Sequence, residues 1–330
     1  MRRIQINNEL RINSKEFCEN LFVKTRKSDF ELPIQRLVKL RDNCKGEIKK
    51  YVENIIKNYS IILDAQPDKM KSLIKEFDLI LPRSFLNEFV PNKNIRFYES
   101  VVKAMRYEDL RDKEFLVYLK YSGIKTCVYC NAQLALVIEK RTNNKKGKKA
   151  KVQNVGKLEL DHFYPKSDHP FLCTSFYNLY PVCGNCNRAK SYKPVLFELY
   201  TDTNELNPFN FWIDDNSILK YWYTNNHADL KVWFEEKNGN FINLKNHDDT
   251  FGIQGLYDTQ TDLAEELIHK AKVYSDKYQK SLVESYNKLF PDQSIVKRLL
   301  IGNYDKPEDI HKRPMAKFTQ DIAKQLGLLK

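Results

Sequence analysis

The sequence predicts an α+β protein that is mainly helical, with a compact strand-and-helix core near its middle and a small antiparallel sheet beyond it. Apolar residues recur at helical spacing before and after the middle of the chain. Strand-forming residues concentrate in 133–160, and cysteines and polar residues that suit metal binding cluster in 127–191. We therefore divide the 330 residues into a helical region 1–123, a core 124–194, and a region 195–330 with the sheet and further helices.

The first region is predicted to be a helical scaffold from about residue 32 to residue 123. Pro67 suits the first turn of one helix. Two more helices are expected over about 97–105 and 109–121, and Gly123 is a typical helix stop. An earlier helix shows one apolar face at three- and four-residue steps, made by Ile48, Tyr51, Val52, Ile55, Ile56 and Tyr59.

The core is predicted to begin with a hairpin. Residues 133–139 and 157–160 favour strands, and 143–147 can turn the chain between them. The tip, 140–151, carries seven basic residues and no acidic one, so it is either a solvated loop or an arm that follows phosphates, and we favour the arm. The tip residues expected to bind nucleic acid are Lys145, Lys146, Lys148 and Lys149.

The third region is predicted to combine a short antiparallel sheet with helices. Aromatic and polar residues alternate over 195–244, and Asn238-Gly239 is a hairpin signal. The clearest alternating runs are 221–223 and 232–234. Helical spacing over 262–290 predicts the longest helix of the chain, and a last short helix is expected over 315–326.

Composition favours a polyanionic partner. Lys and Arg number 55 against 43 Asp and Glu, a formal charge of +12 that suits nucleic acid. No apolar run approaches the roughly 20 residues of a membrane span. No signal-peptide core follows the first residues, so we expect a cytoplasmic protein without a membrane partner.

Four of the seven cysteines form two C-x-x-C pairs, which suits a metal site in a reducing compartment better than disulfides. The pairs are separated by 52 residues, so the intervening chain must loop out and return. Four thiolates are the ligand set of a closed, structural Zn²⁺ site. The alternatives are two unconnected thiol pairs or a redox motif. The predicted zinc ligands are Cys127, Cys130, Cys183 and Cys186.

A second set of residues suits phosphodiester hydrolysis. His162 can act as a general base near neutral pH. Asp161 and Asn187 offer oxygens to a catalytic Mg²⁺ or Mn²⁺ ion. Asp161 and His162 can serve one phosphate only if their strand ends there, which Pro165 favours. Lys190, three residues after Asn187 on a short helix, would contact a phosphate.

Three stretches together resemble the HNH, or ββα-metal, endonuclease motif in its zinc-stabilised form. They are Asp161-His162-x-x-Pro165-x-Ser167, Asn178-Leu179 and Cys183-x-x-Cys186-Asn187-x-x-Lys190-Ser191. The resemblance implies that Asp161 and Asn187 bind the catalytic ion. It also implies that His162 is the general base and that Asn178 orients it. Asn187 departs from the literal motif, which ends in His.

The resemblance implies a metal-dependent endonuclease, most simply of double-stranded DNA, that leaves 5′-phosphate and 3′-hydroxyl ends. Lys166 and Arg188, beside the motif, are expected to contact the nucleic acid, whereas His169 is expected at the surface. The flanks 123–131 and 312–317 look similar to stand-alone HNH proteins of bacterial anti-phage systems of the Septu type, which have an ATPase partner. Two alternatives stay open: a zinc-knuckle module that binds nucleic acid without cutting, and a nuclease subunit active only with an ATPase.

Overall fold

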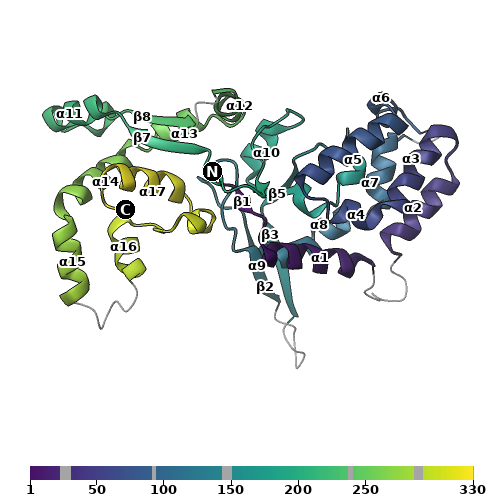
Figure 1. Cartoon of the computed structure of the whole chain (residues 1–330), viewed down its shortest axis with the longest axis horizontal. Coiled ribbons are helices and arrows are strands. Elements are labelled where there is room, and N and C mark those ends of the chain that lie inside the picture. Colours follow the sequence, from purple (N-terminus) through teal and green to yellow (C-terminus); the bar gives the residue numbers. More distant parts are fainter. Residues whose placement is uncertain (23–30, 91–93, 143–150, 237–240, 286–292, 330) are drawn as a thin grey trace.

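The computed structural model shows a chain that is α+β and mainly helical, as predicted. Helices of the first region lie at one end, elements of the third region lie at the other, and the strands of the core lie between them (Figure 1). The structure describes residues 1–22, 31–90, 94–142, 151–236, 241–285 and 293–329.

Nine helices are described in the first region. They are α1 (Asn8–Phe22), α2 (Pro33–Asp42), α3 (Gly46–Lys57), α4 (Tyr59–Leu63), α5 (Pro67–Ile80), α6 (Arg83–Leu86), α7 (Phe97–Ala104), α8 (Tyr107–Arg111) and α9 (Glu114–Ser122). Four residues of the apolar face predicted over 48–59 are buried, and Tyr51 meets Phe77 of α5 edge to face at 5.1 Å between ring centroids. Phe77 in turn stacks on Phe171 of the core at 3.9 Å, so the scaffold is packed directly against the site-bearing segment.

One prediction for this region is wrong, and one helix was missed. The helix expected over 109–121 is two helices, α8 and α9, because Lys113 takes a non-helical backbone conformation between them. Helix α1 was not predicted at all. Gly123 does end α9, with φ of 71° in the left-handed region that glycine favours.

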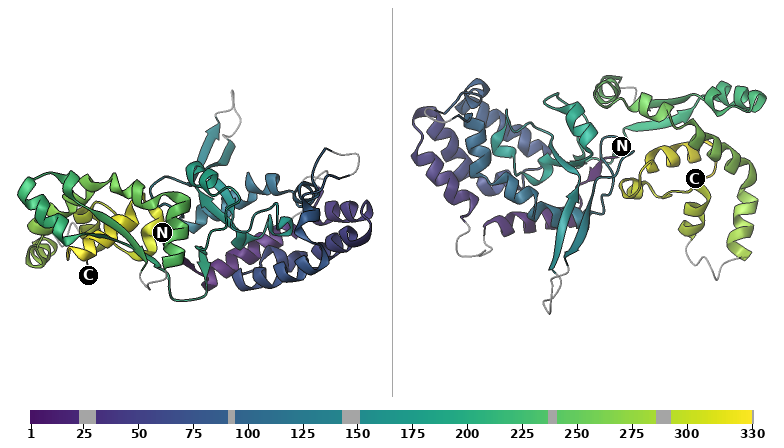
Figure 2. Two further views of the ribbon diagram at one scale, coloured as in Figure 1. Left: turned by 90° about the horizontal axis from the view of Figure 1, so that it is seen from above. Right: turned by 180° about the vertical axis from the view of Figure 1, so that it is seen from behind.

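Two strand pairs lie in the core, and a third pair joins the first region to the third. Strands β2 (Leu136–Thr142) and β3 (Lys151–Lys157) form an antiparallel hairpin that projects from the centre of the molecule in all views (Figures 1 and 2). Strands β4 (Glu159–His162) and β5 (Leu179–Val182) form a second antiparallel pair, followed by α10 (Gly184–Lys190). Strand β1 (Ile4–Gln5) pairs in parallel with β6 (Tyr200–Thr201). Two 3₁₀ turns, Pro170–Leu172 and Phe176–Asn178, lie between β4 and β5.

The strand expected over 157–160 is wrong as a single element. Strand β3 ends at Lys157 and pairs with β2, whereas β4 begins at Glu159 and pairs with β5. The change of partner has a packing reason. Gly156 lies against Leu116 of α9, and β4 continues into the buried centre. The hairpin and the site-bearing strand are therefore separate units.

The third region contains a two-stranded sheet and a group of helices. Strands β7 (Phe209–Ile213) and β8 (Val232–Glu236) pair antiparallel, which confirms the predicted sheet. The other elements are α11 (Asp215–Thr224), a 3₁₀ turn (His227–Asp229), α12 (Phe241–Phe251), α13 (Ile253–Asp258), α14 (Thr261–Val273), α15 (Asp276–Ser285), α16 (Gln293–Ile301), a 3₁₀ helix (Pro307–Lys312) and α17 (Ala316–Gln325). The last of these confirms the helix expected over 315–326.

Two expectations for this region are wrong. Residues 221–223 lie in α11 and not in a strand, because Asp214 caps that helix by accepting from the Ser217 amide at 2.8 Å. The long helix expected over 262–290 is divided into α14 and α15, and Ser275 lies between them. The hairpin signal Asn238-Gly239 lies outside the described residues.

The first residues of the chain pack against the third region. The Ile4 amide donates to the Leu199 carbonyl at 2.6 Å, and His311 Nε2 lies 2.8 Å from the Arg2 carbonyl oxygen. These contacts tie the predicted regions together, and whether each is a separate domain stays a prediction. No helix in the described ranges is long and apolar enough to cross a bilayer.

Candidate active site

The two cysteine pairs form one buried cluster. The ligand atoms all lie within 4.8 Å of one another, and the cluster consists of Cys127, Cys130, Cys183 and Cys186. Four thiolate sulfurs that each lie about 2.3 Å from a central ion are within this distance of one another. The cluster can thus hold a metal ion such as zinc, which confirms that the two pairs make one site despite the long sequence between them.

The cluster joins the segment 127–130 to β5 and α10. The Val128 amide donates to the Pro181 carbonyl of β5 at 3.3 Å, which anchors the first pair. Cys183 begins α10, since its Sγ accepts from the Cys186 amide at 3.5 Å. Hydrogen bonds with the other three cysteines lower the pKa of Cys183, so a thiolate is favoured at this helix start.

A cleft of about 680 Å³ opens where β4 meets α10, the helix that Cys183 caps. Asp161, His162 and Asn187 all line it. Strand β4 ends at His162, as the presence of Asp161 and His162 at one site requires. The other lining residues are Tyr98, Tyr107, Arg111, Asp112, Leu158, Glu159, Leu160, Pro165, Lys166, Ser167, Ser191 and Tyr192.

Asp161 is buried and held on both of its oxygens. Lys190 Nζ donates to Oδ1 at 3.0 Å, and the Tyr129 hydroxyl donates to Oδ2 at 2.6 Å. Burial raises the pKa of Asp161, while the Lys190 and Tyr129 contacts oppose that shift. Each carboxylate oxygen can accept more than one bond, so both keep capacity for a cation.

His162 is a neutral imidazole, and its hydrogen bond with a backbone carbonyl shows which ring nitrogen carries the proton. Its Nε2 lies 3.0 Å from the Cys173 carbonyl oxygen, which can only accept, so Nε2 carries the hydrogen and Nδ1 is the basic nitrogen. Burial lowers the pKa of His162 to about 3. The Tyr107 ring lies 4.6 Å away and covers the imidazole. A neutral, oriented imidazole is the form that a general base requires.

Asn178 holds the loop that orients His162 and does not touch the imidazole. Its Oδ1 accepts from the Tyr164 amide at 2.8 Å. Its Nδ2 donates to the carbonyl oxygens of Tyr164 at 3.2 Å and Leu172 at 3.0 Å. Leu172 precedes Cys173, so Asn178 fixes the carbonyl that positions His162. The orienting role implied by the resemblance is thus indirect in this structure.

Asn187 presents its amide oxygen through a contact that sequence reasoning missed. Its Nδ2 donates to Glu159 Oε2 at 2.6 Å, which leaves Oδ1 as the atom available to a cation. Glu159 stands two residues before Asp161 on β4, and both line the cleft. Strand periodicity places residues two apart on one face, so the spacing was the signal that could have found Glu159.

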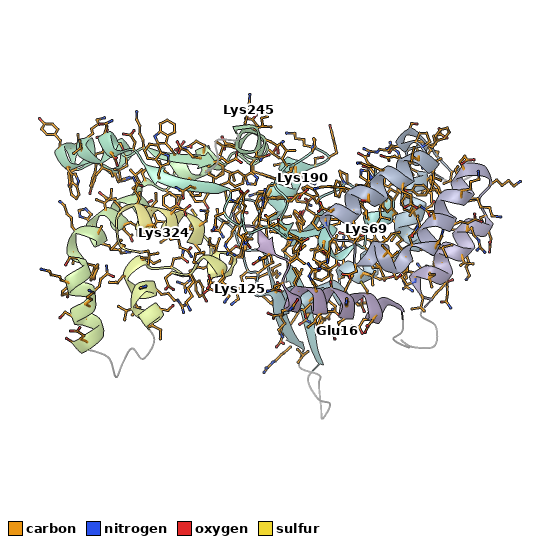
Figure 3. All side chains as sticks on the ribbon, viewed as in Figure 1. Glu16, Lys69, Lys125, Lys190, Lys245 and Lys324 are labelled. Atoms are coloured by element: carbon orange, nitrogen blue, oxygen red, sulfur yellow. The ribbon has the colours of Figure 1, made fainter. Side chains whose placement is uncertain are left out.

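Lys190 is placed differently from the expectation that it contacts a phosphate. The side chain is fully buried, and Nζ donates to Asp161 Oδ1 and to the His162 carbonyl oxygen at 2.7 Å. Figure 3 labels Lys190 at α10 in the middle of the molecule. In this arrangement Lys190 positions the Asp161-His162 pair.

The residues expected to bind nucleic acid are divided. Lys166 lines the cleft, and its Nζ lies 5.3 Å from the centre of the Tyr107 ring. Arg188 is exposed on α10, outside the cleft lining, and donates to Asn185 Oδ1 at 2.6 Å. His169, expected at the surface, is buried, because it packs against Tyr164 and Phe171. The remaining four lysines expected to bind nucleic acid lie outside the described residues: Lys145, Lys146, Lys148 and Lys149.

Comparison of the chain with protein-family models, with curated proteins and with solved structures gave no match. The chemistry of the site is therefore argued from its own residues.

Proposed function

We propose that this protein is a metal-dependent endonuclease of the HNH, or ββα-metal, class, with DNA as its substrate and Zn²⁺ in its four-cysteine site. One observation carries the proposal. Asp161, His162 and Asn187, which come from β4 and α10, line a single cleft, and α10 carries the second cysteine pair at its start. The order β4, β5, α10 is the order of elements that the name ββα describes.

The residues fit a hard divalent cation. Asp161 supplies a carboxylate with free acceptor capacity, and Asn187 supplies a neutral amide oxygen, both of which suit Mg²⁺ or Mn²⁺. When bound there, such an ion neutralises charge that develops on the leaving oxygen. Lys190 and Tyr129 keep Asp161 in place, and Glu159 keeps the Asn187 oxygen turned outward.

The base step belongs to His162. Nδ1 accepts a proton from the attacking water, and the imidazolium that forms is stabilised by the Cys173 carbonyl against Nε2. Lys166 and Arg111 line the cleft, and we expect them to meet the phosphate backbone. The net charge of +12 supports a polyanionic substrate.

The direct test is incubation of the purified protein with supercoiled plasmid and with RNA, with and without Mg²⁺ or Mn²⁺. The proposal expects divalent-dependent nicking or linearisation of the plasmid by wild type and none by Asp161→Ala. Tight plasmid binding without any cleavage in either metal would favour the non-cleaving zinc-knuckle module.

The anti-phage role and the ATPase partner extend this proposal and rest on the resemblance of the flanks alone. A plaque assay on bacteria that express wild type or the Asp161→Ala variant tests them. Protection that depends on Asp161 is expected.

A further inference from the structure

Tyr129 connects the cysteine cluster to the proposed catalytic carboxylate. It stands between Cys127 and Cys130 and is completely buried. Its hydroxyl donates to Asp161 Oδ2 at 2.6 Å, although the two residues are 32 positions apart.

The position of Tyr129 is fixed by its own neighbours. Its ring stacks on Phe251 with centroids 4.4 Å apart and an interplanar angle of 19°. His247 Nε2 lies 2.8 Å from the Tyr129 carbonyl oxygen, so the backbone is held as well. The hydroxyl therefore points at Asp161 from a rigid base.

Each cysteine pair sends one donor to the same carboxylate. Tyr129 belongs to the first pair, and Lys190 ends the helix that the second pair begins. They bind opposite oxygens of Asp161. An aspartate carboxylate turns readily about its last torsion, so one donor on each oxygen fixes its plane.

We propose that Tyr129 is a positioning residue through which the cysteine-bound metal sets the affinity of Asp161 for the catalytic ion. This inference rests on the proposed function, since it takes Asp161 as a ligand of that ion. Partners that orient a metal ligand typically change metal affinity or activity by about 10- to 100-fold when they are removed.

The test compares two variants that each lose one buried hydroxyl near the cluster. Tyr129→Phe removes the bond to Asp161. Tyr257→Phe removes a 2.8 Å bond to the Cys130 carbonyl and does not touch Asp161. Mn²⁺ affinity is measured by electron paramagnetic resonance on full-length, zinc-loaded protein without nucleic acid. We expect Tyr129→Phe to bind Mn²⁺ about 10-fold more weakly, and Tyr257→Phe to bind like wild type.

An unchanged affinity in Tyr129→Phe, or an equal loss in both variants, overturns the inference. If Tyr129→Phe does not fold, Phe251→Leu keeps the hydroxyl but removes the ring that orients it. That variant must then weaken Mn²⁺ binding for the inference to stand. Asp161→Ala separates the two proposals: if it binds Mn²⁺ as wild type does, the proposed metal site itself is wrong, whatever Tyr129 does.

Discussion

The contact between His162 Nε2 and the Cys173 carbonyl decides which nitrogen is left to accept a proton. The carbonyl belongs to a loop that Asn178 fastens with three hydrogen bonds. Burial lowers the pKa of His162 and so disfavours the charged imidazolium. A basic nitrogen is therefore present over the whole physiological pH range without a carboxylate against the ring.

His162→Ala is expected to reduce the cleavage rate by about 10² to 10⁴, because it removes the general base. DNA binding should persist, since no phosphate contact is assigned to the imidazole. Plasmid nicking rates and fluorescence anisotropy of a labelled duplex measure the two quantities. His227→Ala, an exchange of an exposed histidine in the third region, is the matched control and should cut at the wild-type rate. Cleavage by His162→Ala within twofold of wild type would refute the assigned role.

Asn178→Ala is expected to lower the free energy of unfolding by about 2 to 4 kcal/mol, because buried backbone groups of Tyr164 and Leu172 lose their partners. Cleavage should fall as well, since the loop that orients His162 loosens. Urea unfolding and the nicking assay check these outcomes. Asn178→Asp should be intermediate in stability, because it can still accept from the Tyr164 amide. A fully stable Asn178→Ala protein would contradict the loop-holding role.

At the scale of elements, α10 depends on the cysteine cluster, because seven residues are too few for a stable isolated helix. Cys183 caps the helix and Cys186 lies in its first turn, so a bound metal fixes its start. Asn187 and Lys190 then take their positions from that start. Loss of the metal should disturb the cleft as well as the cluster.

Cys186→Ser is expected to lose stoichiometric zinc and to lower the thermal midpoint clearly, since structural zinc contributes on the order of 10 kcal/mol in small zinc domains. Metal analysis by plasma mass spectrometry and a thermal scan provide the measurements. Cys44→Ser changes a half-buried cysteine outside the cluster and should keep its zinc. Wild-type protein that contains no zinc after purification and is nevertheless fully stable would contradict this expectation.

Strands β2 and β3 project from the core (Figures 1 and 2), and the lysine run of the sequence falls between them, outside the described residues. If the run meets phosphates, replacing Lys145, Lys146, Lys148 and Lys149 by Ser should flatten the log–log salt dependence of DNA binding. The slope should change by up to about 3.6 units, at roughly 0.9 for each contact. The measurement uses Asp161→Ala protein so that the DNA is not cut. An unchanged slope would make the run a solvated loop.

Local patterns in the sequence predicted the elements whose signals are local. The apolar face of α3, the glycine stop after α9 and the four clustered cysteines all follow from local sequence signals. Residues 221–223 misled because aromatic residues favour strands, while the stronger signal was the capping Asp214. The division between α14 and α15 had a comparable local signal, the Ser275-Asp276 pair.

Contacts that depend on chain closure could not be predicted in this way. The bond from Tyr129 to Asp161 exists only because two cysteine pairs 52 residues apart come together. Burial of Lys190 follows from the same closure, and helical spacing showed only that it shares a face with Asn187. The candidate metal ligands could therefore be predicted from the sequence, whereas the residues that hold them in position are found only in the tertiary structure.

Across the whole molecule, four histidines are buried as neutral rings. Burial lowers the pKa of His162 and His247 to about 3, and that of His169 and His311 to about 4. In the unfolded chain these groups titrate near pH 6.5. Because the folded values lie below the unfolded ones, the stability is fully present above pH 6.5 and is lost as the pH falls toward 4.

The free energy of unfolding should therefore decrease below pH 6.5 by about 1.4 kcal/mol per pH unit for each proton that the unfolded chain takes up. For the four histidines together the decrease is up to about 5 kcal/mol per pH unit. Urea denaturation between pH 7.5 and pH 5, with excess zinc present, measures the slope. His247→Gln should reduce it by one proton, whereas exchange of the exposed His227 should leave it unchanged. A slope of zero over this range would show that the rings are protonated when folded.

The pairing of β1 with β6 has a consequence for how the chain is made. Residues 4–5 are synthesised long before their hydrogen-bonding partners at 199–201. The helices between them can form before β1 has a partner strand. The last cysteine ligand, at 186, emerges only shortly before that partner strand. Assembly of the four-cysteine cluster and pairing of β1 thus both depend on late-synthesised residues, and a nascent chain stalled before residue 183 would hold the first-region helices without the second cysteine pair.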